Sequence, residues 1–286
     1  MTRFTRLFAL LLALAALGLA GCGGDDGDDD AATNGTETTE TTEEAAFETV
    51  NEGVLTVGSD IPFPPFEFRE GDDLTGFDVE LVEEIASRLG LESVEWTPTA
   101  FETIFTQLAT GRFDMIASAT TITDEREELI NFTDPYYRAQ QALIVNSEAT
   151  PDIQSTADVG EGHTIAVQRG TTGEAWAREN LEPQGAEIRS FPQAPDTYIA
   201  LESGNVQGVI FDEPSAVEEA ANREGLEVVE AIDTGEDYGL GVNPDNEALL
   251  DEVNRVLAEM IEDGGYQEIY DRWFPDAPAG SVAEGS

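Results

Sequence analysis

Beyond its amino-terminal region, the sequence alternates between strand-like and helix-like patterns of apolar residues. Short strand-like runs occur at 54–60, 93–98 and 113–119. Between them, residues 76–90 and 101–111 carry apolar side chains at helical spacing. The order strand, helix, strand, helix, strand predicts a parallel, doubly wound α/β sheet, because each helix returns the chain to the next parallel strand.

A second alternating series follows the strand-like run 141–146. Its predicted strands are 163–168, 186–191 and 206–212, and its predicted helices are 173–181, 195–203 and one opened by Pro214. An amphipathic helix at 246–262 and a terminal segment at 264–274 close the folded part. The runs 141–146 and 236–243 are predicted to cross between two lobes, whose cleft lies where the carboxyl ends of the strands meet. We expect lobe 1 to comprise residues 48–142 with 238–275, and lobe 2 to comprise 143–237.

The amino end has the pattern of a secretory signal. Arg3 and Arg6 precede an apolar run that ends at Ala20 and is shorter than the ~20 residues of a membrane helix, so residues 1–21 are predicted to be a signal peptide. The run closes in Leu-Ala-Gly-Cys, which looks like a bacterial lipobox, where Cys22 becomes the lipidated first residue of the mature protein. The alternative is a plain secretory signal with an incidental cysteine. Because Cys22 is the sole cysteine, disulfides, a CxxC redox site and a thiolate metal site are excluded.

The segment 22–47 is dominated by acidic and threonine residues and has almost no apolar side chains. Such a stretch buries too little surface to offset the entropy lost on ordering. We therefore predict a disordered acidic linker that tethers the folded part to a membrane. Residues 276–286 are predicted to be a flexible tail.

The chain is strongly acidic, with 60 Asp and Glu residues against 13 basic residues, all of them arginine, and a formal net charge of −47. This balance argues against nucleic-acid binding, because phosphate contacts need a basic face. Adaptation to high salt is one explanation, since screening suppresses repulsion among surface carboxylates. Acidic drift without salt adaptation is the other.

Polar and aromatic residues gather where the cleft is expected. They are Asp60 and Phe63 after the first strand, Phe101 at the start of a helix, Ser118, Thr121 and Arg126 after the third strand, and Gly170, Thr171, Thr172 and Asp212 after strands of the second lobe. Arg126 can grip a carboxylate through its planar fork, and Asp60 and Asp212 can accept hydrogen bonds from an ammonium group. Hydroxyls and amides at helix N-termini can assist. The set predicts a zwitterionic ligand, an α-amino acid.

Each of these residues also has a purely structural interpretation. Arg126 alone would more often be a solvated helix residue, and Asp212 could simply cap a helix. Thr171 and Thr172 could be capping residues only, and the two aromatic residues could belong to the core. Their shared position near strand ends favours a binding site.

At these residues the sequence resembles a known family, the extracellular solute-binding proteins of family 3, which are the amino-acid receptors of ABC importers. The resemblance runs from about residue 50 to 275 and is carried by LTVGSDIPFPPFEF, GFDVELVEEIASRLG, FDMIASATTITDEREELINFTDPYY, VQRGTTGEAW and GGYQEIYDRWF. It implies a two-lobe periplasmic-binding fold of type II that closes on an amino acid outside the cytoplasm and docks on an ABC permease. We expect a monomer with no cofactor and no metal.

The resemblance also implies roles for the site residues. In that family the ligand carboxylate is bound at the positions of Arg126, Thr121 and Gly170 to Thr172, the α-ammonium at Asp212, and the side chain between Phe63 and Phe101, with Asp60 at its distal end. Three departures concern specificity: Ala119 stands where several relatives have serine, Gln168 where glutamine-selective relatives have lysine, and Gly173 where a side chain often contributes to selection. With no second basic residue clearly placed for a side-chain carboxylate, we predict a polar or cationic amino acid.

Two other functions fit much of this pattern. A dehydratase that acts on a cyclohexadienyl acid uses the same fold with a buried carboxylate as general acid, which requires a raised pKa. Asp60 and Asp212 are instead predicted to face cations, which favours their ionised forms, so we expect no enzyme. A sensory receptor that presents its ligand to a partner would bind identically, so the sequence does not separate sensing from transport.

Overall fold

The structure is a computed structural model that describes residues 47–275. The predicted signal peptide, Cys22, all but the last residue of the predicted linker and the predicted tail 276–286 lie outside the described residues.

The first sheet contains five strands in the order β4-β1-β5-β12-β6. Strand β1 pairs in parallel with β4 and β5, as predicted, whereas β12 is antiparallel to both of its neighbours. The bounds are Val54–Ser59 (β1), Ser93–Pro98 (β4), Met115–Ile116 (β5), Asn131–Phe132 (β6) and Gly241–Val242 (β12). The sheet is therefore mixed and not wholly parallel, because β12 is supplied by the chain on its return from the second sheet.

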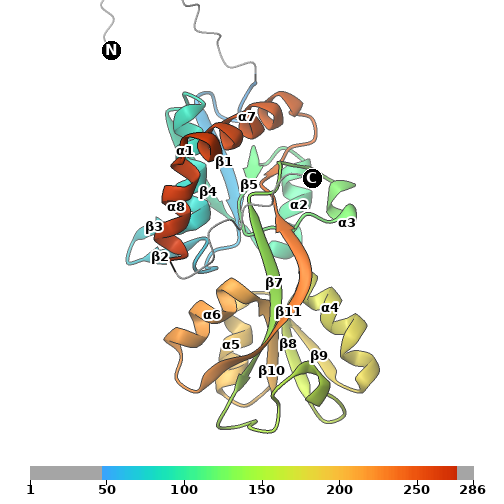
Figure 1. Cartoon of the computed structure of the whole chain (residues 1–286). Coiled ribbons are helices and arrows are strands. Elements are labelled where there is room, and N and C mark those ends of the chain that lie inside the picture. The colour runs from blue at the N-terminus through green and yellow to red at the C-terminus, as the bar shows by residue number, and fades with distance from the viewer. Residues whose placement is uncertain (1–46, 276–286) are drawn as a thin grey trace, which may run out of the picture. The chain divides into compact units, whose positions relative to one another are not determined.

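Helices cover both sides of this sheet, with α1 and α8 on one side and α2 on the other (Figure 1). The bounds of the helices and of a small hairpin are Phe77–Arg88 (α1), Phe101–Ala109 (α2), Asp124–Glu127 (α3), Glu247–Asp263 (α7), Gly265–Trp273 (α8), Phe68–Glu70 (β2) and Asp73–Thr75 (β3). The side chain of Thr123 accepts a hydrogen bond from the Arg126 N–H and so caps the start of α3. Gly264, at φ 88°, separates α7 from α8 in a conformation that suits glycine.

The second sheet contains five strands in the order β11-β7-β10-β8-β9. Strand β8 is parallel to β9 and β10, whereas β7 is antiparallel to β10 and β11. The bounds are Tyr137–Asn146 (β7), Thr164–Gln168 (β8), Glu187–Phe191 (β9), Gly208–Asp212 (β10), Leu226–Tyr238 (β11), Thr172–Asn180 (α4), Ala194–Glu202 (α5) and Glu213–Asn222 (α6), with short 3₁₀ turns at Thr156–Asp158 and Glu182–Gln184. Helices α5 and α6 lie on one side of this sheet and α4 on the other (Figure 1).

Strands β7 and β11 run side by side between the two lobes, as an antiparallel pair (Figure 1). The two predicted crossings are confirmed, but the second one ends earlier than the predicted 236–243. Strand β11 stops at Tyr238, and the chain enters the first sheet as β12. At Gly239 a Cβ atom would meet the Ile122 side chain at 2.9 Å, so the chain makes this change of sheet through a close approach that favours glycine. The division of the lobes at 142/143 and 237/238 stays a prediction, because both points fall within or at the end of these paired strands.

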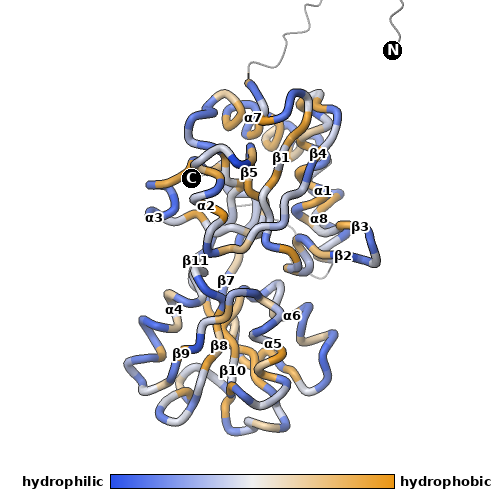
Figure 2. Tube along the Cα trace, turned by 180° about the vertical axis from the view of Figure 1, so that it is seen from behind, coloured by the Kyte–Doolittle hydropathy of each residue, from blue (hydrophilic) through white to orange (hydrophobic). Residues whose placement is uncertain are grey.

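One buried apolar cluster runs from the first sheet through the junction into the second, and each sheet carries a smaller separate cluster as well. Aromatic rings fill the junction beside the crossing strands. Hydrophobic positions, orange in Figure 2, concentrate on central strands such as β8 and β10, while many loops are hydrophilic. At the junction, Phe66 packs edge-on against Tyr137 and Tyr238, and Phe274 lies 4.9 Å from Tyr137 between ring centroids. This packing ties the end of α8 to both crossing strands.

Candidate ligand-binding site

A pocket that is partly open to solvent lies between the two lobes, and its side chains leave a cavity of only about 20 Å³ between them. It is lined by Asp60, Phe63, Phe101, Ser118, Ala119, Thr121, Arg126, Gln141, Gln168, Thr171, Thr172, Phe211 and Asp212. All the predicted site residues except Gly170 are in this set. Gly170 lies beside it and lines a neighbouring open groove.

Arg126 is buried at one end of the cavity, with 8% of its surface exposed. The short helix α3 carries it inward, where its guanidinium donates to the Thr121 carbonyl at 2.7 Å and to the Gly170 carbonyl at 3.3 Å. The guanidinium also stands over the rings of Phe101 and Phe105, at 5.2 and 4.8 Å from their centroids, an arrangement that attracts a cation. Burial lowers the pKa of Arg126, and nearby carboxylates oppose that shift. The structure thus contradicts the interpretation of Arg126 as a solvated helix residue.

Asp212 ends β10 and lines the cavity. The residue keeps some exposed surface, but its carboxyl group is surrounded by protein atoms. One carboxylate oxygen accepts from Gln141 Nε2 at 2.5 Å and the other from the hydroxyl of Tyr238. Gln141 stands directly opposite Asp212 in the antiparallel pairing of β10 with β7. Although Asp212 holds the N-cap position of α6, its side chain makes no capping hydrogen bond, so simple capping does not explain it.

Asp60 follows β1 and is buried at the other end of the site. Its backbone N–H donates to the Ser118 hydroxyl at 3.0 Å, and its carboxylate accepts from Gln168 Nε2 of the second lobe at 2.5 Å. Ser118 in turn donates to Glu67, which is fully buried beneath the cavity. Ser118 therefore supports Asp60 from below, with its own hydroxyl proton already used.

The two site carboxylates have raised pKa values, contrary to the expectation from sequence. Burial raises the pKa of Asp60 to about 6, against the hydrogen bond from Gln168. Burial, followed by the charge of Glu236, raises the pKa of Asp212 to about 7, against Tyr238, Gln141 and Arg126. Burial and the charge of Asp78 raise the pKa of Glu67 well above its usual range. The loss of hydration outweighs the partners that the protein itself supplies.

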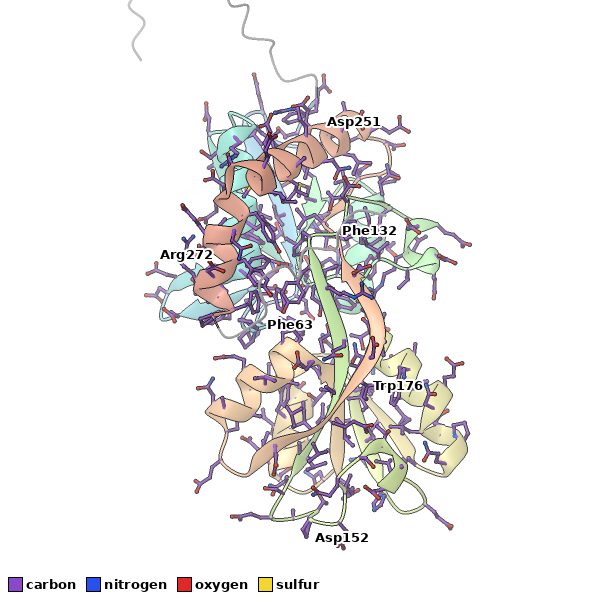
Figure 3. All side chains as sticks on the ribbon, in the orientation of Figure 1. Phe63, Phe132, Asp152, Trp176, Asp251 and Arg272 are labelled. Carbon is purple, nitrogen blue, oxygen red and sulfur yellow. The ribbon has the colours of Figure 1, made fainter. Side chains whose placement is uncertain are left out.

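Aromatic rings form the apolar walls. Phe63 lies between the two lobes (Figure 3), and its ring centroid is 5.4 Å from that of Phe211 on β10. Phe101 lines the cavity and packs edge-on against Phe105. Phe63 and Phe101 are therefore both core residues and cavity walls, so the two interpretations of these residues are compatible.

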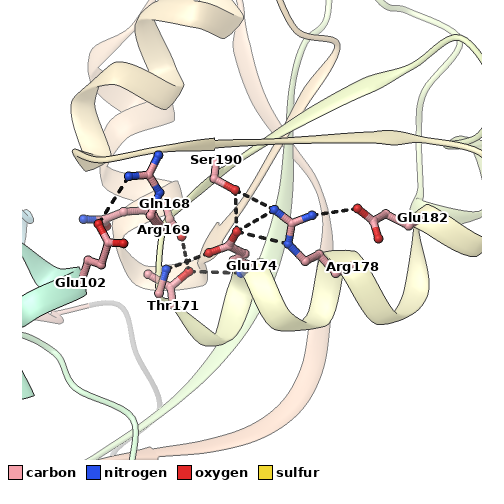
Figure 4. Close-up of polar contacts among 9 residues, drawn as sticks. Glu102, Gln168, Arg169, Thr171, Glu174, Arg178, Glu182 and Ser190 are labelled. Atoms are coloured by element: carbon pink, nitrogen blue, oxygen red, sulfur yellow. Dashed lines mark hydrogen bonds and ion pairs between the residues drawn. The ribbon is translucent and has the colours of Figure 1, made fainter.

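The turn before α4 is held by its own hydrogen bonds (Figure 4). Thr171 caps α4 by accepting from the Glu174 N–H at 3.1 Å, and its hydroxyl donates to the Gln168 carbonyl at 2.9 Å. Glu174 accepts from the Gly170 N–H at 2.7 Å. The hydroxyl of Thr171 thus serves the fold, as the capping interpretation expected, and the start of α4 lies at the cavity wall through Thr171 and Thr172.

The hydroxyls of Thr121 and Thr172 both donate to Glu236, at 2.7 and 2.8 Å. Glu236 lies on β11 and was not predicted as a site residue. Sequence reasoning also missed Gln141 and Phe211 as site residues, and noted Gln168 only as a departure at a position that concerns specificity. Gln168 and Phe211 could have been predicted, because both lie at or near the carboxyl end of a strand. Gln141 and Glu236 lie within the crossing strands β7 and β11, so a search of residues that follow strands does not find them.

Within residues 47–275, no group of three or more His, Cys, Asp and Glu residues is arranged to hold a metal ion. None of the helices described in that range is long and apolar enough to cross a membrane.

A cavity that joins two α/β lobes, with a buried cation and two carboxylates on its walls, defines a two-lobe binding protein. Residues 55–276 match the model of the bacterial extracellular solute-binding proteins, family 3. The chain therefore belongs to this family, whose members are extracellular.

Curated and solved relatives agree with that assignment. The L-cystine-binding protein TcyJ of Escherichia coli (strain K12) is 33% identical over 226 residues, which cover 78% of this chain and 83% of that protein. An ancestral arginine-binding protein, solved bound to arginine, is 35% identical with a TM-score of 0.74 over 78% of this chain and 98% of that one. An ancestral amino acid-binding protein described as a precursor of cyclohexadienyl dehydratase is 36% identical with a TM-score of 0.72, over 78% and 96% of the two chains.

Proposed function

We propose that this protein binds an α-amino acid with a cationic or polar side chain in the cavity between its lobes and delivers it to an ABC importer. The observation that carries the proposal is the placement of Arg126 and Asp212, two groups of opposite charge, on the wall of one cavity but on different lobes. A zwitterion that bridges them satisfies both.

In the proposed pose the ligand carboxylate contacts the guanidinium of Arg126 and the N–H groups at the start of α4. The ammonium contacts Asp212, and the side chain passes between Phe63 and Phe101 toward Asp60. Asp60 and Gln168, which meet from opposite lobes, then read the distal end of the side chain.

The charge balance of the site favours a cationic side chain. The carboxylates of Asp60 and Asp212 line the cavity and that of Glu236 lies beside it, whereas Arg126 is the single guanidinium in its wall. A neutral zwitterion leaves that imbalance of charge unchanged. A ligand with an additional positive charge near Asp60 removes part of it and favours the ionised carboxylate. Arginine is the first candidate, in keeping with the arginine-bound relative, and cystine is the alternative that the curated relative suggests.

Closure of the two lobes is the proposed mechanism. Because the ligand contacts both lobes only when they are closed, it binds the closed form better and shifts the population toward it. The closed form then docks on a membrane permease that an ATPase drives. A receptor that presents the ligand to a sensor would use the same steps up to docking.

We further propose that the chain is a monomeric lipoprotein, anchored through Cys22 after removal of residues 1–21, and that its acidic surface is an adaptation to high salt. The support is the sequence pattern around Cys22 and the net charge of −47. Incorporation of radiolabelled palmitate into the wild-type chain, but not into Cys22→Ser, tests the anchor. Unfolding temperatures in low and high salt test the second point.

A dehydratase is the second candidate, and the raised pKa of Asp212 is the observation that favours it. However, Asp212 already accepts two hydrogen bonds from side chains that line or adjoin the cavity, an arrangement that suits an ion-binding carboxylate as well as an acid. We propose binding without catalysis. Incubation with a cyclohexadienyl acid, followed by ultraviolet absorbance of an aromatic product, should show no turnover above the rate without protein.

The deciding experiment is a thermal-shift screen of the protein against the twenty amino acids, ornithine, citrulline and cystine, followed by calorimetry. A ligand that binds the folded state alone raises the unfolding temperature by mass action. We expect arginine and related cations to give the largest shifts. If no amino acid shifts a folded sample, the proposed function is wrong.

A further inference from the structure

A carboxylate on a crossing strand is hydrogen-bonded to both lobes. Glu236 is buried, with 7% of its surface exposed, near the end of β11. Its Oε2 accepts from the hydroxyl of Thr121, which follows β5 of the first sheet, and from the hydroxyl of Thr172, which begins α4 of the second lobe. Its Oε1 accepts from Gln141 Nε2 at 3.0 Å and from the hydroxyl of Thr234 at 2.9 Å. One side chain thus collects donors from both lobes and from both crossing strands.

The backbone of β11 turns this side chain inward at the crossing. The pairing of β11 with β7 shifts register between Ile232 and Glu236, and such irregularities bend a strand and redirect a side chain. Gln141, on the partner strand, donates through the same nitrogen to Glu236 and to Asp212. Glu236 is therefore linked directly to the residue assigned to the ligand ammonium.

Hydroxyl chemistry limits what Thr121 and Thr172 can do while Glu236 is bonded to them. A threonine hydroxyl has a single proton to donate, and an ionised carboxylate can only accept. When that proton goes to Glu236, the hydroxyl has none left for a ligand carboxylate. The ligand carboxylate is then left to Arg126 and to backbone N–H groups.

We propose that Glu236 is a positioning residue that fastens the two lobes in their closed arrangement through Thr121 and Thr172, whose hydroxyl protons serve this fastening and not the ligand carboxylate. The inference deepens the proposed function, on which its binding readout rests, whereas its structural readout needs no ligand. We therefore expect the hydrogen bonds of Glu236, on the crossing strand β11, to favour the closed arrangement even when no ligand is bound.

The test measures the distance between the lobes in the full-length chain. Cys22→Ser removes the sole cysteine, and Thr106→Cys on α2 with Glu179→Cys on α4 places two exposed spin labels on opposite lobes. Without added amino acid, we expect Glu236→Gln to lower the ratio of closed to open molecules about threefold, since one acceptor oxygen remains, and Glu236→Ala about tenfold. Glu227→Gln, an exposed glutamate on the same strand, is the matched control and should leave the distances unchanged.

A combination of variants separates the two roles of the threonines. Thr121→Val with Thr172→Val should open the lobes to the same extent as Glu236→Ala, and should add nothing in the Glu236→Ala background. The proposal is overturned if the threonine variants weaken arginine binding in calorimetry without changing the distances, or if Glu236→Gln behaves as the control does. If arginine and every other amino acid fail to bind the unmodified chain, the proposed function falls, while the distances still decide the role of Glu236.

Discussion

The two ends of the cavity are built in opposite ways. At one end, Arg126 is held mainly within its own lobe, by the Thr121 carbonyl and by the rings of Phe101 and Phe105. At the other end, Asp60 receives its side-chain hydrogen bond from Gln168, which belongs to the opposite lobe. Only the bond from Arg126 to the Gly170 carbonyl crosses to the other lobe at the first end. On the proposed closure, the first end is therefore largely in place before the lobes meet, whereas the second is completed when they close.

This difference suggests a division of labour between general affinity and selectivity. A preformed cation can hold the carboxylate that every α-amino acid shares, because preorganisation lowers the cost of binding. A carboxylate that depends on closure can test the part of the ligand that differs from one amino acid to the next. The predictions below change one end at a time, from the largest expected effect to the smallest.

Replacement of Arg126 by Ala should nearly abolish binding of every amino acid. The ligand carboxylate would lose its charged partner in a buried site, at a cost of about 4 kcal/mol or roughly a thousandfold in affinity. Arg126→Lys should recover only part of this, because an ammonium lacks the planar fork. Calorimetry is the measurement, and Arg255→Ala on the exposed face of α7 is the control. Near-native affinity in Arg126→Ala would show that Arg126 does not bind the ligand carboxylate, and the comparison between the two ends of the cavity would fail.

Replacement of Asp212 by Asn should weaken binding of all amino acids at least ~100-fold, since the ammonium loses its counterion. In the wild-type chain the affinity should rise with pH up to and somewhat beyond about 7, the raised pKa of the free Asp212 carboxyl, because the ionised form is the one that binds the ammonium. This pH dependence should be absent in Asp212→Asn. Calorimetry between pH 5 and 8.5 checks both points.

The same residue should affect stability in the opposite sense. The folded pKa of Asp212 lies above its ordinary value of 3.8, so the folded state holds the proton more tightly and stability falls as pH rises from about 4 to about 7. Without ligand, the free energy of unfolding of Asp212→Asn should therefore exceed that of the wild type by about 2–4 kcal/mol at pH 8 and by little at pH 4. Denaturant unfolding at the two pH values measures this difference. Equal free energies of unfolding for the wild type and Asp212→Asn at pH 8 would show that burial does not destabilise the ionised Asp212 carboxylate.

Replacement of Asp60 by Asn should change selectivity more than general affinity. If Asp60 reads the distal end of the side chain, binding of arginine should fall by about 10- to 100-fold while that of citrulline, its neutral counterpart, falls little. Competition calorimetry with the two ligands gives the ratio, and Asp72→Asn at an exposed turn is the control. A uniform loss for both ligands would mean that the two ends do not divide the task.

Replacement of Phe105 by Leu should reduce affinity about three- to tenfold, because the guanidinium of Arg126 loses the nearer of its two rings, a cation–π interaction of about 1 kcal/mol. Leu129→Ala, an exposed residue nearby, serves as the control. The loss should be the same for arginine and for citrulline, since the ring acts on the end that both ligands share.

The smallest effect is expected at the rim, where Arg169 of the second lobe pairs with Glu102 of the first at 3.3 Å and both side chains are exposed. Glu102→Gln should change affinity by less than about twofold. Any effect seen in low salt should disappear at high salt because of screening. A larger loss of affinity would mean that the ion pair between Arg169 and Glu102, outside the cavity, contributes to the free energy of lobe closure.

Most of the site could be found from sequence because its residues follow strands. Asp60 and Asp212 lie at strand ends that periodicity predicts, and Arg126 lies on the short helix that follows another. The parallel strands of each lobe bring these ends to the edge of their sheet that faces the cleft. The contributions from β7 and β11 could not be found this way. Gln141 lines the cavity through antiparallel pairing, and Glu236 reaches residues of its wall beside a local register shift. Both features depend on contacts between segments far apart in the chain.

The sequence by itself determined the class of fold, the two crossings and the chemical types gathered in the cleft, because hydrophobic spacing and strand-end position are local properties of a chain. Only the tertiary structure decided how those groups are used. It showed that the hydroxyls of Thr121 and Thr172 are bonded to Glu236, that Thr171 caps a helix, and that burial raises the pKa values of Asp60 and Asp212. The physical reason is that hydrogen-bond partners and desolvation arise where distant segments meet, and no local pattern specifies them.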